Sequence, residues 1–246
     1  MSNFDFDLDM QAKSCLGLIV LQADETIEQD FRRLLPADAK LYVSRVPSGL
    51  EVTRETLSQM ENHIPISAGL FPDAVDFDAI GYGCTSGTSV IGCDRVHVLV
   101  RAGARTKSVT EPVSALIAAC SELGVRRLAF LSPYLESVSD GLCNLLRESG
   151  LEIPVFGSFN VAEEAKVARI SAGSVIEAAL ALVDQVEVDA IFLSCTNLRT
   201  LDVIAPIEER IGKPVLSSNL VLSWHMCRLA QIGQMPEGFG KLMRTI

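Results

Sequence analysis

Several features that mark other protein classes are scarce in this chain. Its seven cysteines include no Cys-x-x-Cys pair, and only three histidines accompany them. This pattern argues against a zinc site and against a disulfide framework, so we expect free thiols and no metal. No apolar run approaches the roughly 18 residues that span a bilayer. The acidic N-terminus lacks the basic and apolar regions of a secretory signal, which favours a cytoplasmic protein with a short, disordered leader.

Positive charge is also in short supply. The chain has 21 Lys and Arg against 31 Asp and Glu, which gives a net charge of −10. Without a basic surface, nucleic acid and anionic membranes are poor partners. A small anion would have to bind through local hydrogen-bond donors.

What the chain does contain is an internal repeat. The segment Asp78–Thr85 returns as Asp189–Thr196, with Cys84 and Cys195 at matching positions 111 residues apart. A looser pair of segments repeats at a spacing of 110 residues: Gly17–Asp24 and Arg127–Tyr134. Two matches at nearly one spacing indicate a duplicated unit. A chain of 246 residues is long enough for two such halves, each with its own core.

Apolar segments rich in Ile, Val and Leu alternate with segments of helical period. The predicted strands are Leu16–Gln22, Leu41–Val46, Ala79–Gly83, Leu128–Ser132, Pro154–Phe159, Ala190–Ser194 and Pro214–Ser217. The predicted helices are Glu25–Leu35, Thr53–Ser67, Thr88–Ala102, Glu111–Leu123, Ser137–Glu148, Ser174–Asp184, Asp202–Ile211 and Asn219–Ile232. Continuously apolar strands in strict alternation with helices are typical of parallel sheets buried on both faces.

We therefore predict an α/β fold of two pseudo-symmetric, Rossmann-like parallel-sheet halves with the active site in the cleft between them. The first half is predicted to comprise residues 1–110 and 217–246, and the second residues 111–216. In open parallel sheets, ligands bind at the carboxyl ends of the strands. Cys84 and Cys195 lie at such ends, as do Asp24 and Tyr134 after the first strand of each half.

The residues beside the two cysteines suit an anion pocket. Thr85 and Ser86 follow Cys84, whereas Thr196 and Asn197 follow Cys195. Hydroxyls, an amide and exposed backbone N–H groups at a helix start can hold a carboxylate or an enolate. The same donors are expected to lower the pKa of a nearby thiol from about 8.5. A small carboxylate or dicarboxylate is therefore the predicted substrate.

The remaining cysteines and the histidines carry less information. Free cysteine is usually an apolar filler, and we interpret five of them in this way: Cys15, Cys93, Cys120, Cys143 and Cys227. His97 follows Cys84 by more than three helical turns, which is too far for it to act as the base for that thiol. His225, beside Trp224, is interpreted as a packed core neighbour.

Several of these motifs together resemble a known family. They are Gly83–Gly87, Ser194–Thr200, the opening Gly17–Val20, Tyr134 after its strand, and Ser217–His225. The pattern is similar to the aspartate/glutamate racemase superfamily over nearly the whole chain, and most similar to its branch of maleate cis-trans isomerases and arylmalonate decarboxylases. The resemblance implies a cofactor-independent enzyme with two α/β halves and a site between them.

The resemblance also implies roles for the two thiols. In the racemases, paired cysteines act as opposed base and acid on a carbon next to a carboxylate. In the maleate isomerases, the thiol matching Cys84 adds to the double bond and the thiol matching Cys195 handles the proton. Arylmalonate decarboxylases have glycine at the first position, so the presence of Cys84 disfavours decarboxylation.

One position departs from the isomerase pattern. These isomerases carry asparagine in the first strand–helix loop, where this chain has Asp24. An ionised carboxylate there would repel a dicarboxylate. It could instead bind a substrate ammonium or assist a proton transfer. The surrounding residues also resemble racemase-like proteins of bacterial ectoine utilisation.

Three functions stay open at this point. The first is a two-cysteine isomerase of a small carboxylate, similar to maleate cis-trans isomerase. The second is a racemase of an amino acid or hydroxy acid that uses two-base proton transfer, with ectoine degradation as one setting. The third is a non-catalytic relative that binds a small carboxylate. A homodimer also stays open, because dimers are common among such enzymes while the sequence does not determine the assembly.

Overall fold

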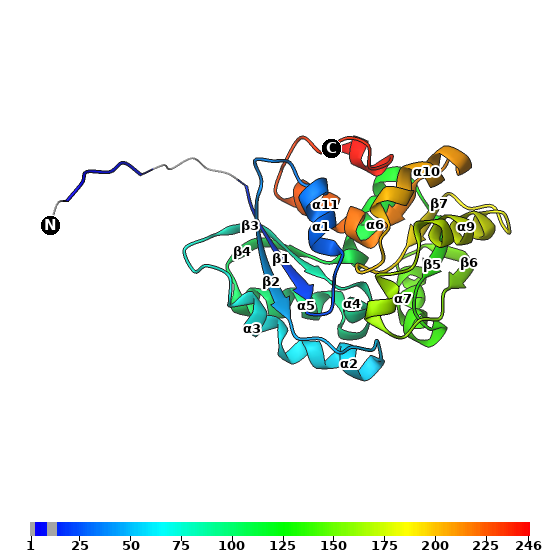
Figure 1. The fold of residues 1–246 in the computed structure, drawn as a ribbon, viewed down its shortest axis with the longest axis horizontal. Helices are drawn as coiled ribbons and strands as arrows, with labels where there is room; N and C mark the ends of the chain where they lie inside the picture. The colour runs from blue at the N-terminus through cyan, green and yellow to red at the C-terminus, as the bar shows by residue number, and fades with distance from the viewer. Residues whose placement is uncertain (1–2, 9–13) are drawn as a thin grey trace.

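The computed structural model describes residues 3–8 and 14–246. Residues 3–8 are exposed, and they extend away from the folded body (Figure 1). The remainder of the predicted leader lies outside the described residues.

Two parallel sheets form the centre of the molecule, as predicted, and each has four strands. The first has the order β2-β1-β3-β4 and the second the order β6-β5-β7-β8, so the two sheets share one topology. The strands are β1 (Cys15–Leu21), β2 (Lys40–Val46), β3 (Phe77–Gly83), β4 (Thr106–Thr110), β5 (Arg127–Ser132), β6 (Glu152–Ser158), β7 (Ala190–Leu193) and β8 (Val215–Ser217).

Helices cover both sheets and connect their strands (Figure 1). The α-helices are α1 (Ile27–Leu34), α2 (Arg54–Gln59), α3 (Ile64–Ala68), α4 (Thr85–Ile91), α5 (Cys93–Gly103), α6 (Pro112–Leu123), α7 (Glu136–Glu148), α8 (Glu164–Val167), α9 (Ala172–Val183), α10 (Leu201–Ile211) and α11 (Ser218–Leu229). Two short 3-10 helices are also present: η1 (Met60–Asn62) and η2 (Leu242–Thr245).

The central strands are apolar because helices pack on both faces of each sheet. β3 and β7 are buried almost along their whole length. The register places Ile19 of β1 beside Tyr82 of β3, and Leu131 of β5 beside Leu193 of β7. The carboxyl ends of β3 and β7, where the chain leaves each strand, therefore occupy equivalent positions in the two sheets.

The predicted elements needed several corrections, and one of them is that helix α8 was not predicted. Strand β4 was not predicted, because its sequence Thr-Lys-Ser-Val-Thr is largely polar, as an edge strand permits. The helix predicted over Thr88–Ala102 begins earlier and is broken at Gly92, whose φ of 95° ends α4. The helix predicted over Thr53–Ser67 is divided among α2, η1 and α3.

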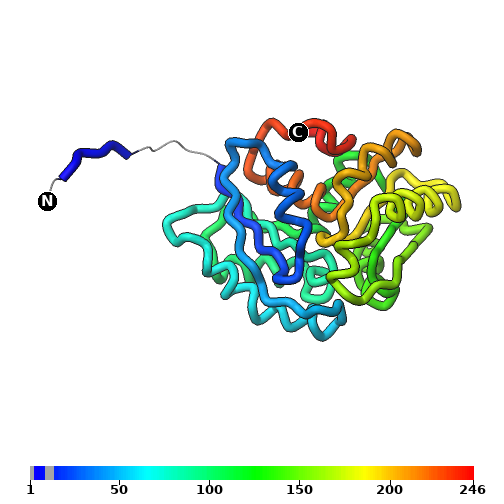
Figure 2. Tube along the Cα trace, in the orientation of Figure 1, coloured from blue at the N-terminus to red at the C-terminus, as the bar shows by residue number. Residues whose placement is uncertain are grey.

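Helix α11 joins the two sheets. It follows β8 of the second sheet but packs against β3 of the first sheet and against α1 and α6. Figure 2 shows this orange segment returning to the blue N-terminal helix. The division into residues 1–110 with 217–246 and residues 111–216 stays a proposal.

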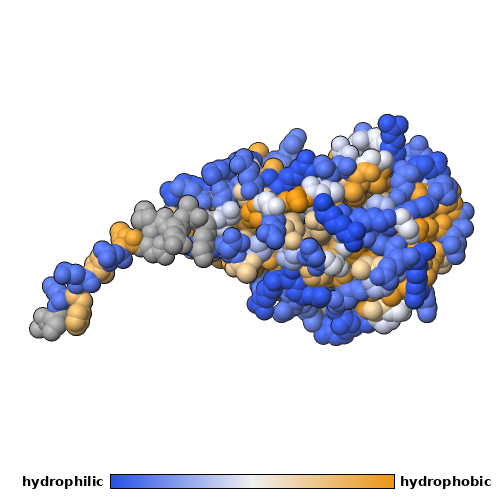
Figure 3. All heavy atoms as spheres, turned by 90° about the horizontal axis from the view of Figure 1, so that it is seen from above, coloured by the Kyte–Doolittle hydropathy of each residue, from blue (hydrophilic) through white to orange (hydrophobic). Residues whose placement is uncertain are grey.

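Within the described ranges, no helix combines the length and the apolar character needed to cross a membrane. On the face seen in Figure 3, hydrophilic and hydrophobic residues are interspersed.

Candidate active site

The ends of β3 and β7 bring the predicted site residues to one small cavity. All eight of them line a space with an empty volume of about 290 Å³: Asp24, Cys84, Thr85, Ser86, Tyr134, Cys195, Thr196 and Asn197. Its other walls are three apolar side chains and one acid that sequence reasoning missed: Leu21, Val52, Leu57 and Glu164. Only about 10 Å³ of this space is open to the centre of a water-sized sphere, which is room for about one water molecule, so a substrate would have to part the walls of the cavity.

Cys84 is held by backbone groups at the start of α4. Its backbone is extended, and its Sγ accepts a hydrogen bond from the Gly87 N–H at 3.1 Å, as an N-cap side chain does. The missing side chain of Gly87 makes room for the sulfur, because a Cβ there would lie 2.8 Å from the Cys84 Sγ. The Thr88 hydroxyl also donates to the Cys84 carbonyl oxygen at 2.7 Å.

Cys195 is held differently. Its φ of 98° is unusual for a residue other than glycine, and such strain is often found at functional sites. Its backbone N–H donates to the Ser218 Oγ at 3.0 Å, which ties the strained turn to the start of α11. Its Sγ lies 2.9 Å from the Tyr134 Oη and accepts from the Asn197 N–H at 3.3 Å.

The pKa values of both thiols are raised, contrary to the expectation that helix-start donors would lower them. Burial raises the pKa of Cys84 to about 12 and that of Cys195 well above its ordinary value. The nearby carboxylates of Glu164 and Asp24 raise both pKa values further. The donors from Gly87 and Asn197 lower these pKa values, but burial dominates.

One carboxylate oxygen of Asp24 accepts hydrogen bonds from the backbone, and the other accepts none from the residues that the structure describes. Its Oδ1 accepts from the N–H groups of Thr26 and Ile27, both at 2.8 Å. Its Oδ2 is buried and has no hydrogen-bond partner among the described residues. Burial raises the pKa of this carboxyl, although the two backbone donors partly offset the rise.

Glu164 is the acid that sequence reasoning missed. It begins the four-residue helix α8, lies in the cavity wall and is buried. Its Oε1 accepts from the Tyr134 Oη at 2.9 Å, and its Oε2 accepts from the Asn197 Nδ2 at 2.9 Å. Burial raises its pKa, and the charge of Asp24 contributes in the same direction. These partners lie 30 and 33 residues away in the sequence, so no local pattern signals the site.

The polar side chains around the thiols also join the two halves. Thr85 donates to the Ser218 Oγ at 2.8 Å, so that Ser218 links it to the Cys195 backbone. Thr196 donates to the Gly83 carbonyl oxygen at 3.3 Å. Ser218 was not among the predicted site residues, although it lies within the Ser217–His225 motif.

Both polar atoms of the Asn197 side-chain amide are hydrogen-bonded within the protein. Its Oδ1 accepts from the Glu25 N–H at 2.8 Å, and its Nδ2 donates to the carbonyl and the carboxylate of Glu164 at 3.1 and 2.9 Å. Its backbone N–H reaches the sulfur of Cys195. Asn197 therefore holds β1–α1, α8 and the Cys195 turn together.

The charges that line the cavity are all negative. Asp24 and Glu164 are its charged side chains, and the lining contains no Lys, Arg or His. Arg45 approaches from behind Asp24, where its Nη1 donates to the Asp24 carbonyl oxygen at 3.1 Å. A ligand in this cavity would thus meet two buried acids together with neutral donors.

The other cysteines and the histidines lie away from the cavity lining. Cys120, Cys143 and Cys227 are buried, while Cys15 and Cys93 are partly buried. His97 Nε2 lies 3.6 Å from Glu111, and His225 Nδ1 lies 2.7 Å from the Thr110 Oγ1. Among residues 3–8 and 14–246, no group of three or more metal-ligating side chains is arranged to hold a metal ion.

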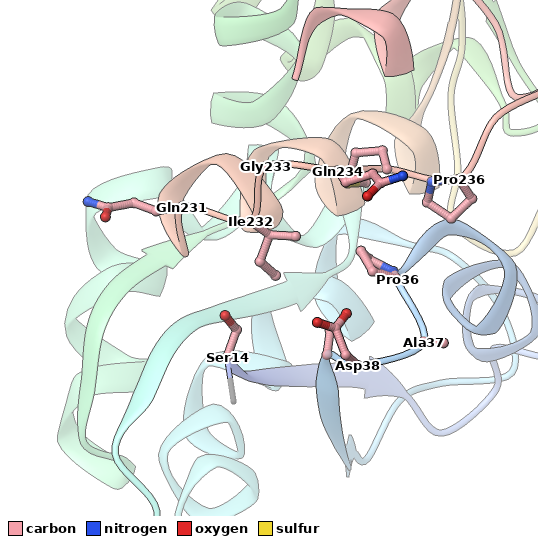
Figure 4. A pocket seen from close by; sticks show the side chains of 11 residues that line it. Ser14, Pro36, Ala37, Asp38, Gln231, Ile232, Gly233, Gln234 and Pro236 are labelled. Carbon is pink, nitrogen blue, oxygen red and sulfur yellow. The ribbon is translucent and has the colours of Figure 1, made fainter. Parts of the chain in front are cut away.

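A larger hollow lies outside this site. It is formed by Ser14, residues 36–39 and residues 231–236 (Figure 4). Asp38 is its one charged side chain, and it contains no thiol. The thiols and the buried acids meet in the smaller cavity instead.

The fold and the paired thiols define a member of the aspartate/glutamate racemase superfamily. A family model described as arylmalonate decarboxylase matches residues 102–243, more than half of the chain, and the protein belongs to this family. A maleate isomerase from Pseudomonas putida is 23% identical over 243 residues, which cover 93% of this chain and 96% of the relative.

Solved structures share the fold. The maleate isomerase of Pseudomonas putida S16 with maleate has a TM-score of 0.84 at 23% identity, covering 94% of this chain and 97% of that one. A cysteine-to-serine variant of the Nocardia farcinica maleate cis-trans isomerase carries a covalently bound succinylcysteine intermediate. It has a TM-score of 0.81 at 23% identity, covering 95% of this chain and 99% of that one.

Proposed function

We propose that this protein is a cofactor-independent isomerase of a small carboxylate that uses two cysteines, similar to the maleate cis-trans isomerases. The observation that carries the proposal is the convergence of Cys84 and Cys195, from equivalent strand ends, on one cavity of small volume. The similarity to maleate isomerases over nearly the whole chain supports it. Binding alone would have no use for a matched pair of thiols.

In the isomerase reaction, Cys84 enters as a thiolate whose proton has passed to solvent, and its sulfur forms a bond to one carbon of a double bond conjugated with a carboxylate. The electron pair moves into that carboxylate, and Cys195 gives a proton to the other carbon. Rotation about the resulting single bond follows. Cys195 then removes the proton, the C–S bond breaks and the double bond forms again. Thr85, Ser86, Thr196 and the backbone N–H of Asn197 are the proposed donors to the substrate oxygens.

The charge of the cavity favours a second candidate, a two-base racemase of a carboxylic acid that carries an ammonium group. A dicarboxylate would add two negative charges beside Asp24 and Glu164, so both acids would have to bind protons first. An ammonium group would instead pair with one of them and offset one of the two negative charges. It would also weaken the repulsion that raises the pKa of both thiols. Here one thiol would remove the proton next to the carboxylate and the other would return one to the opposite face.

Proton exchange in deuterated water tests both candidates. The protein, dialysed against a chelator, is incubated with maleate, aspartate, glutamate, diaminobutyrate derivatives and hydroxy acids, and products are followed by NMR. Conversion of maleate to fumarate would identify the isomerase. Exchange at a stereocentre with loss of optical activity would identify the racemase.

A Cys84→Ser/Cys195→Ser double variant is the control for this experiment. Conversion that persists in the double variant would overturn the proposal, as would the absence of exchange and conversion across the whole panel.

A further inference from the structure

We propose that Glu164 is a positioning residue that switches Cys195 between acid and base through the hydroxyl of Tyr134. The inference rests on the proposed function in one respect, namely that Cys195 transfers a proton. It assigns a role to a residue of α8 that contacts the thiol through another side chain. Both isomerisation and racemisation would use it.

The three groups form a continuous chain of hydrogen bonds. The Tyr134 Oη lies 2.9 Å from the Cys195 Sγ and 2.9 Å from the Glu164 Oε1. All three side chains are buried. A phenol has a single proton, so the direction of one bond determines the direction of the other. When the Tyr134 hydroxyl donates to ionised Glu164, its oxygen is left to accept from the Cys195 thiol.

Asn197 determines which carboxylate oxygen can take the proton. Its Oδ1 accepts from the Glu25 N–H, so its amide orientation is set and its Nδ2 faces the Glu164 Oε2 as a donor. The Oε2 atom therefore has to accept. A proton that arrives at Glu164 is directed to the Oε1, the oxygen in contact with Tyr134.

The hydrogen bonds among Cys195, Tyr134 and Glu164 consequently have two arrangements with the same number of protons. In the first, Cys195 is a thiol, Tyr134 donates to Glu164, and Glu164 is ionised. In the second, Glu164 holds a proton on its Oε1 and donates to the Tyr134 Oη, while Tyr134 donates its own proton to a Cys195 thiolate. One proton leaves sulfur and one arrives at the carboxylate, so the charge moves without a loss of hydrogen bonds.

Two other titratable groups face this chain. Asp24 lies in the same cavity wall, where its charge raises the pKa of Glu164 and of Cys195. Cys84 lies across the cavity and raises the pKa of Tyr134 if it is ionised. Burial itself raises the pKa of Glu164, which makes this carboxylate a better proton acceptor.

The test is a titration of Cys195 without substrate. Cys84→Ser protein is titrated by the ultraviolet absorbance of its thiolates, and the titration of Cys84→Ser/Cys195→Ser protein is subtracted to isolate Cys195. Both titrations are then repeated with Glu164→Gln introduced into each of the two proteins. Glutamine can accept from Asn197 and donate to the Tyr134 Oη, which imitates the protonated acid. We expect at least about tenfold more Cys195 thiolate at a given pH below its titration midpoint, a pKa decrease of about one unit.

A double-mutant cycle distinguishes an effect transmitted through the Tyr134 hydroxyl from the simple loss of the Glu164 charge. In a Tyr134→Phe background the hydroxyl is absent, and we expect Glu164→Gln to change the Cys195 titration by less than about a third as much. An equal shift in both backgrounds would overturn the inference, because it would show a through-space charge effect alone. No shift in either background would overturn it as well.

The exposed neighbour Glu163 offers a matched control. Glu163→Gln removes the same charge one residue away, outside the cavity lining, and should leave the titration of Cys195 unchanged. Because no substrate is used, this experiment can fail or succeed independently of the proposed function. With an active substrate in hand, Glu164→Gln should lower kcat more than it changes KM, since Cys195 would hold a proton less readily.

Discussion

The two halves of the molecule place a cysteine after the equivalent strand but surround it with different chemistry. In the first half, Cys84 caps α4, and its sulfur accepts a backbone N–H bond from Gly87. In the second half, Cys195 occupies a strained turn, and its sulfur contacts the Tyr134 hydroxyl, which is bonded in turn to Glu164. The scaffold is duplicated, whereas the hydrogen-bonded chain from thiol through phenol to carboxylate is found beside the second thiol.

This difference indicates a division of labour between the thiols. A sulfur that accepts a backbone N–H bond at a helix start and lines the cavity is positioned like a nucleophile or a base. A sulfur at the end of a chain of acidic side chains has a route for its proton. We therefore assign Cys84 to the bond to carbon and Cys195 to the proton in the proposed isomerase reaction.

The largest expected effect tests whether both thiols are needed. We expect Cys84→Ser and Cys195→Ser each to lower turnover by at least about 10²-fold, because serine is a far weaker acid and nucleophile than cysteine at these positions. Steady-state kinetics with the substrate found by NMR measures the loss. Full activity in either variant would remove that residue from the mechanism and end the comparison.

A second substitution disturbs the first half alone. In Gly87→Ala, the new Cβ would lie 2.8 Å from the Cys84 Sγ and equally close to the side chains of Met60 and Tyr82. We expect turnover to fall by about tenfold, since a displacement of this kind is costly for a positioned group. Gly141→Ala on α7 is the control, because a Cβ there meets nothing within 4 Å. Equal activity of both variants would show that the position of Cys84 is not critical.

The third substitution asks which charge the cavity selects. Asp24 is a buried acid, and one of its carboxylate oxygens has no hydrogen-bond partner among the described residues. Asp24→Asn replaces this acid by a neutral amide. We expect the ratio of kcat/KM for a dicarboxylate to that for an ammonium-bearing acid to rise about tenfold, which corresponds to about 1.4 kcal/mol. Glu25→Gln, a change in the exposed neighbour that pairs with Arg169, should leave the ratio unchanged. An unaltered ratio in Asp24→Asn would show that this position does not discriminate by charge.

The smallest expected effect is on the free energy of unfolding. It concerns one buried acid in each half, and both acids lie outside the cavity lining. Asp30 accepts from the Asn219 Nδ2 at 2.8 Å, and burial raises its pKa from 3.8 to about 6. Because the folded state holds this proton more tightly than the unfolded state, the wild-type protein loses stability as pH rises from about 4 to about 6. We expect Asp30→Asn to be more stable above pH 6 by on the order of 1 kcal/mol, with no gain below about pH 4.

Chemical denaturation at both ends of this pH range measures the difference. Glu208 in the second half is the comparison, because it accepts from the backbone N–H groups of Val215 and Lys241 at 3.0 Å. Glu208→Gln should therefore weaken charge-assisted bonds and lower the free energy of unfolding. A gain for Asp30→Asn that is the same at low and high pH would contradict the titration of Asp30.

Much of the architecture could be predicted from local patterns. Continuous apolar runs identified seven of the eight strands, and the repeat around Cys84 and Cys195 identified the edges where the site forms. Strand β4 escaped because it is short and largely polar. Helix α8 escaped because four residues are too few for a helical period, and with it escaped Glu164.

The sequence by itself determined the two-fold α/β plan and the eight residues that meet in the cavity, because buried strands and their following loops leave local signals. Only the tertiary structure decided that burial raises the pKa of both thiols, that Asn197 is hydrogen-bonded to Glu25 and Glu164, and that Glu164 lies behind Tyr134. Those properties depend on burial and on contacts between residues far apart in the chain. No local pattern of residues contains that information.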